Sequence, residues 1–137
     1  NINPLYNISS QKGNKIHSKN SDGFETWKKY DENNNCIHYK TSEGYESWKK
    51  YDNNNNIIHH KDSEGYQIWR KYDKNNNMIH YKDSNNIEYW REYDEQNNLT
   101  YNKDHSGSEE WRKFDKNNNC IYYKNSYGYE RFYSPEK

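Results

Sequence analysis

Glutamates and histidines, which enzymes use for acid–base chemistry and metal binding, recur along this chain at multiples of 21 residues. The glutamate column consists of Glu25, Glu46, Glu88, Glu109 and Glu130. The histidine column consists of His17, His38, His59 and His80, and it continues as Tyr101 and Tyr122. Catalysis requires one asymmetric group of residues with perturbed pKa values in a pocket. Because these side chains are repeated, we expect them to be structural or to form an extended binding surface. We therefore predict no enzyme activity and no catalytic residue.

The histidine column does not have the geometry of a metal site. Zinc ligands lie about 2.1 Å from the ion, whereas equivalent histidines of neighbouring hairpins would lie about 9.6 Å apart, two strands away. His59 and His60 are adjacent, and neighbouring residues of a strand point to opposite sides. Tyrosine at the last two positions of the column indicates aromatic packing. No phosphate-binding glycine loop or nucleophile elbow occurs, so we predict no metal and no cofactor.

The tryptophans show that the whole chain is one repeat array. They are Trp27, Trp48, Trp69, Trp90 and Trp111, and Phe132 follows at the next interval. Tyr6 falls in the same column, and Gly13 falls in the column of Asn34. A fixed period indicates one small structural unit copied along the chain. We predict a single repeat domain over residues 1–137, with a degenerate N-terminal cap at 1–15, full repeats at 16–36, 37–57, 58–78, 79–99 and 100–120, and a partial repeat at 121–137.

The composition excludes a thick aliphatic core. Only 28% of the residues are hydrophobic, while 18% are aromatic. Low hydrophobicity is typical of disordered chains, but disorder gives no reason for aromatic residues to recur in register. The 21 basic and 21 acidic residues give a net charge of zero, so there is no net attraction to nucleic acid or anionic membrane. No apolar stretch approaches the roughly 20 residues of a membrane span, and we predict no membrane association.

The two cysteines, Cys36 and Cys120, occupy a column that otherwise holds Ile57, Met78 and Leu99. We interpret them as small apolar side chains, four repeats apart, and not as a disulfide pair. Neither a disulfide pattern nor a signal peptide is visible in the sequence. The location is unknown: these observations favour the cytoplasm, while a surface or secreted location stays open.

Each repeat contains two turn signals. The first is glycine or asparagine, the residues that best tolerate positive φ, at Gly23, Gly44, Gly65, Asn86, Gly107 and Gly128. The second is an asparagine-rich run such as 53–56. Aromatic and β-branched runs of strand length, such as 45–51 and 57–61, separate the turns. We predict an all-β fold, an antiparallel meander of about six 21-residue hairpin repeats and about a dozen strands, forming a curled single-layer sheet.

A parallel β-solenoid with one coil per repeat is the competing fold. It would stack the lysine column at about 4.8 Å, with like charges facing each other. Hairpins separate the same lysines by about 9.6 Å, close to the Debye length, so we favour hairpins. The assignment of side chains to the two faces of the sheet stays open. Alternation puts Trp27 on the opposite face from Phe24 and Tyr30, unless a bulge at Lys28–Lys29 brings the three together. The lysine column is Lys19, Lys40, Lys61, Lys82, Lys103 and Lys124.

The segment Gly44–Asn56 has the pattern Gly-Tyr-Glu-x-Trp-x-x-Tyr-Asp-x-x-Asn-Asn. This pattern resembles the YD repeats of Rhs-type bacterial proteins and teneurins. Its part Trp48–Asp52, with the asparagine turn, also resembles the MORN-variant repeats of bacterial antitoxin-like proteins. Choline- and glucan-binding repeats share Trp-x-x-Phe/Tyr-Asp before a turn. The resemblance implies antiparallel hairpins. It also implies an antitoxin, immunity or inhibitor protein of a bacterium or phage, which would act by covering its partner.

A long aromatic ribbon flanked by charges predicts a non-catalytic protein-binding module, because Trp, Tyr and Arg are enriched at interface hot spots. Binding of cell-wall glycan or choline and binding of single-stranded nucleic acid are the alternatives, and the array is otherwise a spacer in a larger protein. Open sheet edges would permit self-association. The candidate binding residues are Trp27, Trp48, Trp69, Trp90, Trp111, Tyr30, Tyr51, Tyr72, Tyr93, Lys40, Lys61, Lys82, Arg70 and Arg91.

The fifth copy departs most from the pattern, at Thr100, Asn102, His105 and Ser108, where most other copies have apolar or aromatic residues. Repeats near the end of an array are commonly atypical. We interpret the departure as sequence drift, with reshaping for a partner as the alternative.

Overall fold

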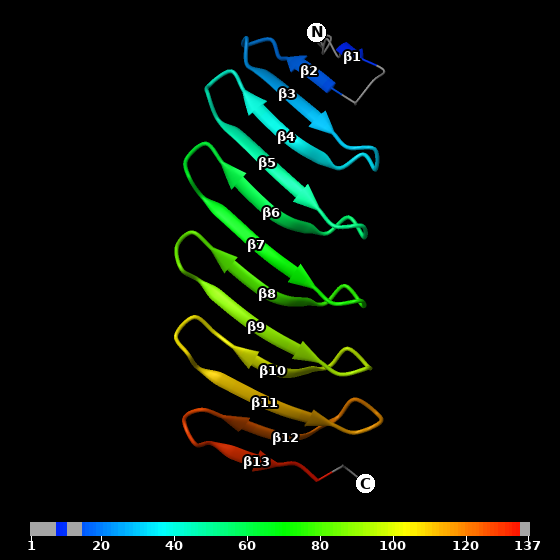
Figure 1. Ribbon diagram of the computed structural model, residues 1–137, viewed down its shortest axis with the longest axis vertical. Coiled ribbons are helices and arrows are strands. Elements are labelled where there is room, and N and C mark those ends of the chain that lie inside the picture. Colours follow the sequence, from blue (N-terminus) through cyan, green and yellow to red (C-terminus); the bar gives the residue numbers. More distant parts are fainter. Residues whose placement is uncertain (1–7, 11–14, 135–137) are drawn as a thin grey trace. The chain divides into compact units, whose positions relative to one another are not determined.

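The computed structural model describes residues 8–10 and 15–134, which form strands joined by short turns (Figure 1). Tyr6 and Gly13, which the repeat pattern assigned to the tryptophan and asparagine columns, lie outside the described residues. The strands are β1 Ile8–Ser10, β2 Lys15–Lys19, β3 Glu25–Tyr30, β4 Cys36–Thr41, β5 Glu46–Tyr51, β6 Ile57–Asp62, β7 Gln67–Tyr72, β8 Met78–Asp83, β9 Glu88–Tyr93, β10 Leu99–Lys103, β11 Glu109–Phe114, β12 Cys120–Asn125 and β13 Glu130–Phe132.

Strand order in the sheet follows sequence order, and the registered pairs are antiparallel. This confirms the predicted antiparallel meander of hairpins and excludes the parallel solenoid. The chain forms two compact units, residues 1–68 and 69–137, with the boundary inside β7. We describe each unit by itself. The single repeat domain stays a prediction.

The glycine turns have the geometry that the sequence predicts. In the turn after β4, the Thr41 N–H donates to the Tyr45 carbonyl at 2.9 Å, and the Gly44 N–H donates to the Thr41 carbonyl at 3.2 Å. Gly44 has φ of 91° and Asn86, the one non-glycine in this column, has φ of 64°. This is a three-residue hairpin loop closed by a left-handed residue.

The asparagine turns use the same geometry with different residues. The Asp52 N–H donates to the Asn56 carbonyl at 3.0 Å, and the Asn55 N–H donates to the Asp52 carbonyl at 3.1 Å. Asparagine tolerates the left-handed conformation because its short polar side chain can bond locally, which accounts for the asparagine-rich run. The left-handed residues are Asn34, Asn55, Asn76, Asn97 and Asn118.

The aspartate that begins each asparagine turn holds the loop together. The Asp94 carboxylate accepts the Asn98 side-chain amide at 3.0 Å and the backbone N–H groups of Asn98 and Gln96, each at 2.9 Å. These donors, with the Asn98 side chain first, hold the pKa of the Asp94 carboxyl below its usual value. At Asp31, Asp52 and Asp73 partial burial raises the pKa, but the turn donors outweigh it and the net pKa is lowered.

Successive hairpins within a unit are joined at both ends. At the glycine end, the Ser42 N–H donates to the Glu25 carbonyl at 2.9 Å, and the Glu25 N–H donates to the Ser42 hydroxyl at 3.0 Å. At the asparagine end, the Asn35 side-chain amide donates to the Asn55 side-chain oxygen at 2.7 Å. These bonds link residues 17 and 20 positions apart. They fix each hairpin on the next. Equivalent bonds join Ser63 to Glu46, Ser126 to Glu109, Asn77 to Asn97 and Asn98 to Asn118.

A bulge interrupts the ladder in the β3–β4, β5–β6, β9–β10 and β11–β12 hairpins, but not at the place that the sequence suggested. Lys29 pairs with His38 and Tyr30 pairs with Cys36, so Ile37 is the extra residue of the β3–β4 pair. The bulge therefore lies on β4, and a bulge at Lys28–Lys29 is wrong. Because alternation along β3 continues without a break, Trp27 and Tyr30 lie on opposite faces, and both faces carry aromatic residues.

Neither unit has a thick apolar core, in agreement with the composition. Ile68, 9% exposed, is the one buried hydrophobic side chain of the described residues, and the buried polar ones are Thr41, Ser47 and Asp83. Each unit is thus a single layer of strands, stabilised by its ladders, its turns and the side chains on its two faces. The described part of the chain contains no helix long and apolar enough to cross a bilayer.

Substitution of Gly44 tests the left-handed turn position. We expect Gly44→Ala to reduce the free energy of unfolding by about 1–2 kcal/mol, because a β-carbon disfavours positive φ. No neighbour within 4 Å would touch the new β-carbon, so the cost is conformational and not steric. Gly44→Asn should cost less, because Asn86 occupies the equivalent position. Urea unfolding followed by circular dichroism measures both, and equal losses would contradict the assignment.

Substitution of Asp94 tests the carboxylate that closes the asparagine turn. We expect Asp94→Ala to lower Tm at pH 7 by about 2–6 °C, and Asp94→Asn to lower it less, because Asn20 accepts the equivalent backbone bonds in a glycine turn. The folded-state pKa is lowered, so the stabilisation by the charge is present above the unfolded pKa of about 3.9 and is lost as pH falls through the folded value. The difference between wild type and Asp94→Asn should therefore shrink as pH falls through the folded pKa, and thermal scans at decreasing pH measure it. A difference that does not shrink with falling pH would contradict the role of the charge.

Candidate binding face

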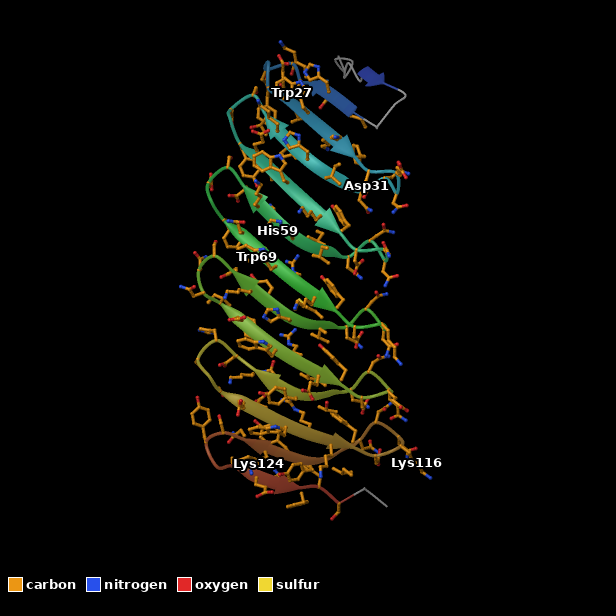
Figure 2. All side chains as sticks on the ribbon, in the orientation of Figure 1. Trp27, Asp31, His59, Trp69, Lys116 and Lys124 are labelled. Atoms are coloured by element: carbon orange, nitrogen blue, oxygen red, sulfur yellow. The ribbon has the colours of Figure 1, made fainter. Side chains whose placement is uncertain are left out.

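The tryptophans of each unit lie on one side of its strands, which we call the Trp face, and we call the other side the Tyr face. In the first unit Trp27 pairs with Lys40, Lys40 pairs with Glu46, and Trp48 follows Glu46 by two residues. In the second unit Trp90 pairs with Lys103, which pairs with Glu109, two residues before Trp111. Paired residues and residues two apart share a face. Figure 2 shows Trp27 over the strands of the first unit and Asp31 at the turn beyond them.

The sheet divides the predicted binding residues between the two faces. Lys40 and Lys61 lie on the Trp face of the first unit, and Lys82 lies on that of the second unit, opposite Glu88. The tyrosines and arginines among the candidates lie on the Tyr face. The expectation that tryptophans and tyrosines form one ribbon is therefore wrong. The physical reason is that each Tyr lies three positions after a Trp. Side chains of a strand return to the same face every two positions, so an odd spacing puts the two on opposite faces. The residues on the Tyr face are Tyr30, Tyr51, Tyr72, Tyr93, Arg70 and Arg91.

The Trp48 ring lies between a ring on the preceding strand and a lysine on the following strand. His38 stacks on Trp48 with 5.4 Å between centroids and an interplanar angle of 15°. From the other flank, Lys61 Nζ lies 4.8 Å from the centre of the Trp48 ring. Both ring faces are therefore covered, and the ring edge points to solvent.

The histidine contact recurs at Trp27, and both contacts recur at Trp90. His17 lies 4.9 Å from Trp27 at an angle of 4°, and His80 lies 5.4 Å from Trp90, whose other flank faces Lys103 at 6.0 Å. Trp27 is 36% exposed and Trp90 38% exposed, so both rings remain accessible at the surface.

The repeated glutamates orient the stacking rings. His38 Nε2–H donates to Glu46 at 2.6 Å, and in the fifth copy the Tyr101 hydroxyl donates to Glu109 at 2.9 Å. Tyrosine thus replaces histidine without loss of the carboxylate bond or of the contact with Trp111, at 5.7 Å. The pKa of Tyr101 is raised, first by partial burial and then by this bond. The histidine and glutamate columns therefore have structural partners in the described hairpins, in line with the packing role expected for them. Equivalent bonds join His17 to Glu25, His59 to Gln67, His80 to Glu88 and Tyr122 to Glu130.

No group of three or more His, Cys, Asp or Glu side chains within the described ranges is placed to hold a metal ion. Both cysteines are free thiols, and Cys36 Sγ–H donates to the His38 carbonyl at 3.4 Å. What the Trp face offers chemically is a set of ring edges, ammonium groups and imidazoles.

An open groove runs along the Trp face of each unit. The groove of the first unit has a volume of about 810 Å³, and the groove of the second has a volume of about 600 Å³. Trp48, Lys29, Lys50 and Lys61 line the first groove together with two histidines. Such grooves have the form of an extended binding surface rather than of an enclosed active site.

The charged groups of the Tyr face are engaged with their neighbours. Arg112 lies 5.4 Å from the Tyr123 ring and 2.7 Å from Glu110, which also accepts the Tyr123 hydroxyl at 2.8 Å. Arg91 lies 5.7 Å from the Tyr89 ring and donates to Asn102 at 3.3 Å.

The atypical fifth copy keeps the hairpin geometry. The Thr100 hydroxyl donates to the Glu92 carbonyl at 3.1 Å, Asn102 accepts Arg91, and the Ser108 N–H donates to Asp104 at 3.1 Å. Thr100 and Asn102 thus make side-chain bonds, His105 lies with its ring 6.1 Å from the Tyr89 ring, and the Ser108 backbone bond is the one found in other glycine turns. Whether a partner selected these departures stays a prediction. Sequence reasoning missed the links between hairpins, namely Ser42 and Asn35. The recurrence of Ser or Asn at these positions could have indicated these hydrogen bonds, but the same residue types are common in turns and were interpreted as turn residues.

When the sequence is compared with models of protein families and with curated proteins, no family model matches and no curated protein matches.

Replacement of His38 tests the stacked arrangement. We expect His38→Tyr to keep the free energy of unfolding within about 0.5 kcal/mol, because Tyr101 and Tyr122 show that a phenol fits this position. His38→Ala should cost about 0.5–1.5 kcal/mol through loss of the stack on Trp48. Chemical unfolding and Trp fluorescence measure both, and a Tyr variant as unstable as the Ala variant would contradict it.

Proposed function

We propose that this chain is a non-catalytic protein-binding module that contacts its partner through the Trp face. The observation that supports the proposal most directly is the orientation of the tryptophans. Trp48 is covered by His38 on one ring face and by Lys61 on the other. Only its edge is available to a ligand.

Edge-on tryptophans favour a protein partner over the alternatives. Bases of single-stranded nucleic acid stack on open aromatic faces, and a quaternary ammonium group such as that of choline also needs a ring face. Sugars stack on ring faces in the same way. At Trp48 the His38 and Lys61 side chains occupy these positions. A protein surface can instead pack against ring edges and bond to the surrounding polar groups.

The Trp face also has the rigidity expected of a protein interface. The stack on Trp48 and the Glu46–His38 bond hold these side chains before a partner arrives. Little further side-chain entropy is lost on binding, which favours affinity. Tryptophan is among the residues most enriched at interface hot spots.

The resemblance to YD and MORN-variant repeats favours a particular form of this function. A module of this kind would serve as an antitoxin, immunity or inhibitor protein of a bacterium or phage, and would cover the working surface of its partner. Repeated carboxylates engaged by neighbouring rings, as at Glu46 and Glu109, support a role without catalysis.

The test uses tryptophans of each unit with controls on the same strands. The immobilised chain captures proteins from a lysate of the organism that produces it, and the captured protein is then purified and titrated calorimetrically. We expect Trp27→Ala or Trp90→Ala to weaken binding about 30-fold or more, as at an interface hot spot. The controls Tyr30→Ala and Tyr93→Ala, on the Tyr face, should change binding less than about threefold.

Trp27→Phe and Trp90→Phe complete the design, because they keep an aromatic ring against the stacking histidine and remove the indole edge. A loss in both Ala and Phe variants, with unchanged thermal unfolding of the Phe variants, would support the proposal. Equal losses on the two faces would contradict it, and so would binding to neutral glycans or oligothymidylate that the tryptophan substitutions abolish while no protein is captured.

A further inference from the structure

The charges on the Trp face of the first unit are unbalanced. Its described strand positions carry only two carboxylates, Glu25 and Glu46. Glu25 lies 2.7 Å from His17 and 2.9 Å from Lys19, and Glu46 lies 2.6 Å from His38. Lys19 is the one lysine of residues 16–68 that lies within ion-pair distance of either carboxylate. The lysines on this face are Lys19, Lys29, Lys40, Lys50 and Lys61.

Four of these lysines are exposed and form no ion pair with a carboxylate of the described residues. Lys61 lies over the Trp48 ring, and Lys29, Lys50 and Lys61 line the groove of this unit. Acidic groups of the unit lie mostly in its turns, as at Asp31 and Asp52, where the turn donors already bind them. The groove is thus a cationic site with aromatic edges.

The lysines have a regular spacing. Lys29 and Lys50 are equivalent residues of β3 and β5, and Lys40 and Lys61 are equivalent residues of β4 and β6. Each pair is therefore two strands apart, about 9.6 Å. A polyproline II segment has three residues per turn and a rise of about 3.1 Å, so residues i and i+3 project to the same side about 9.3 Å apart.

We propose that the Trp face of residues 16–68 binds an acidic, extended protein segment whose carboxylates recur at every third residue. This inference rests on the proposed function and names the chemistry of the partner. Successive carboxylates pair with Lys29 and Lys50, and the apolar positions between them pack on the Trp48 edge. Nucleic acid has the required charge, but the covered ring faces deny it base stacking.

Two synthetic peptides labelled with fluorescein test the spacing. One is (Glu-Pro-Pro)₄, and the other has the same composition with its four glutamates contiguous. Fluorescence anisotropy at low ionic strength should give at least about threefold tighter binding for the first, because only its carboxylates match the lysine spacing. Affinity should fall as salt is raised, because the ion pairs are exposed. Equal affinity of the two peptides would overturn the spacing.

Lysines inside and outside the groove provide a matched pair of variants. Lys29→Glu/Lys50→Glu reverses two charges in the groove, and Lys28→Glu/Lys116→Glu makes the same change in net charge at two lysines that do not line it, one on the Tyr face of β3 and one in the asparagine turn after β11. We expect the first to weaken (Glu-Pro-Pro)₄ binding about tenfold or more and the second less than about threefold. Equal losses would overturn the inference. Lys29→Gln/Lys50→Gln, which removes the charges without reversal, should weaken binding in the same direction and replaces the Glu variant if thermal unfolding shows that one to be destabilised.

Two further comparisons distinguish a failure of this inference from a failure of the proposed function. Tighter binding of a 12-residue oligothymidylate than of (Glu-Pro-Pro)₄ would replace the acidic segment by single-stranded nucleic acid. If a captured protein loses affinity for Trp27→Ala but not for Lys29→Glu/Lys50→Glu, the inference fails and the proposed function stands. If no captured protein depends on the Trp face, the proposed function itself fails.

Discussion

The structure depends on a three-residue turn that is closed by a residue in the left-handed conformation. Gly44 ends one such turn and Asn55 ends the other, so both ends of every hairpin use one geometry. The turn sets the register of the strands that it joins. Since no thick core holds the strands in place, this register and the Ser42 and Asn35 bonds between hairpins keep equivalent side chains aligned within each unit.

Alignment of the hairpins determines what the Trp face can offer. Trp48 lies between a histidine from the strand before it and a lysine from the strand after it. The stack stabilises a single-layer sheet that has little else to bury, and it also turns the indole edge-on. The same packing places His38 and Lys61 on the two flanks of the Trp48 ring, and the proposed protein-binding role rests on this arrangement. Stability and the character of the binding surface have one cause.

Much of the fold could be predicted from particular residues. The exchange of glycine for Asn86 identified a left-handed position, and the lysine column argued for hairpins against a solenoid; the φ of 64° and the antiparallel registers confirm both. The candidate site was only partly predictable. The sequence left open whether Tyr30 shares the face of Trp27, because a bulge at Lys28–Lys29 would bring them together. The bulge lies instead at Ile37 of the opposite strand, so alternation along β3 keeps the two residues on opposite faces.

The sequence by itself determined the repeat, the turns and the strands, because period, left-handed residues and β-propensity are local properties of the chain. It also determined which residue types recur together. Only the tertiary structure decided which of them meet. Cross-strand register places His38 on Trp48 and brings Glu46 to the histidine that it orients. It also places Lys29 and Lys50 where they form no ion pair with a carboxylate of the described residues. The turns set this register, but the bulge at Ile37, which shifts it within the hairpin, is not marked by a local signal in the sequence.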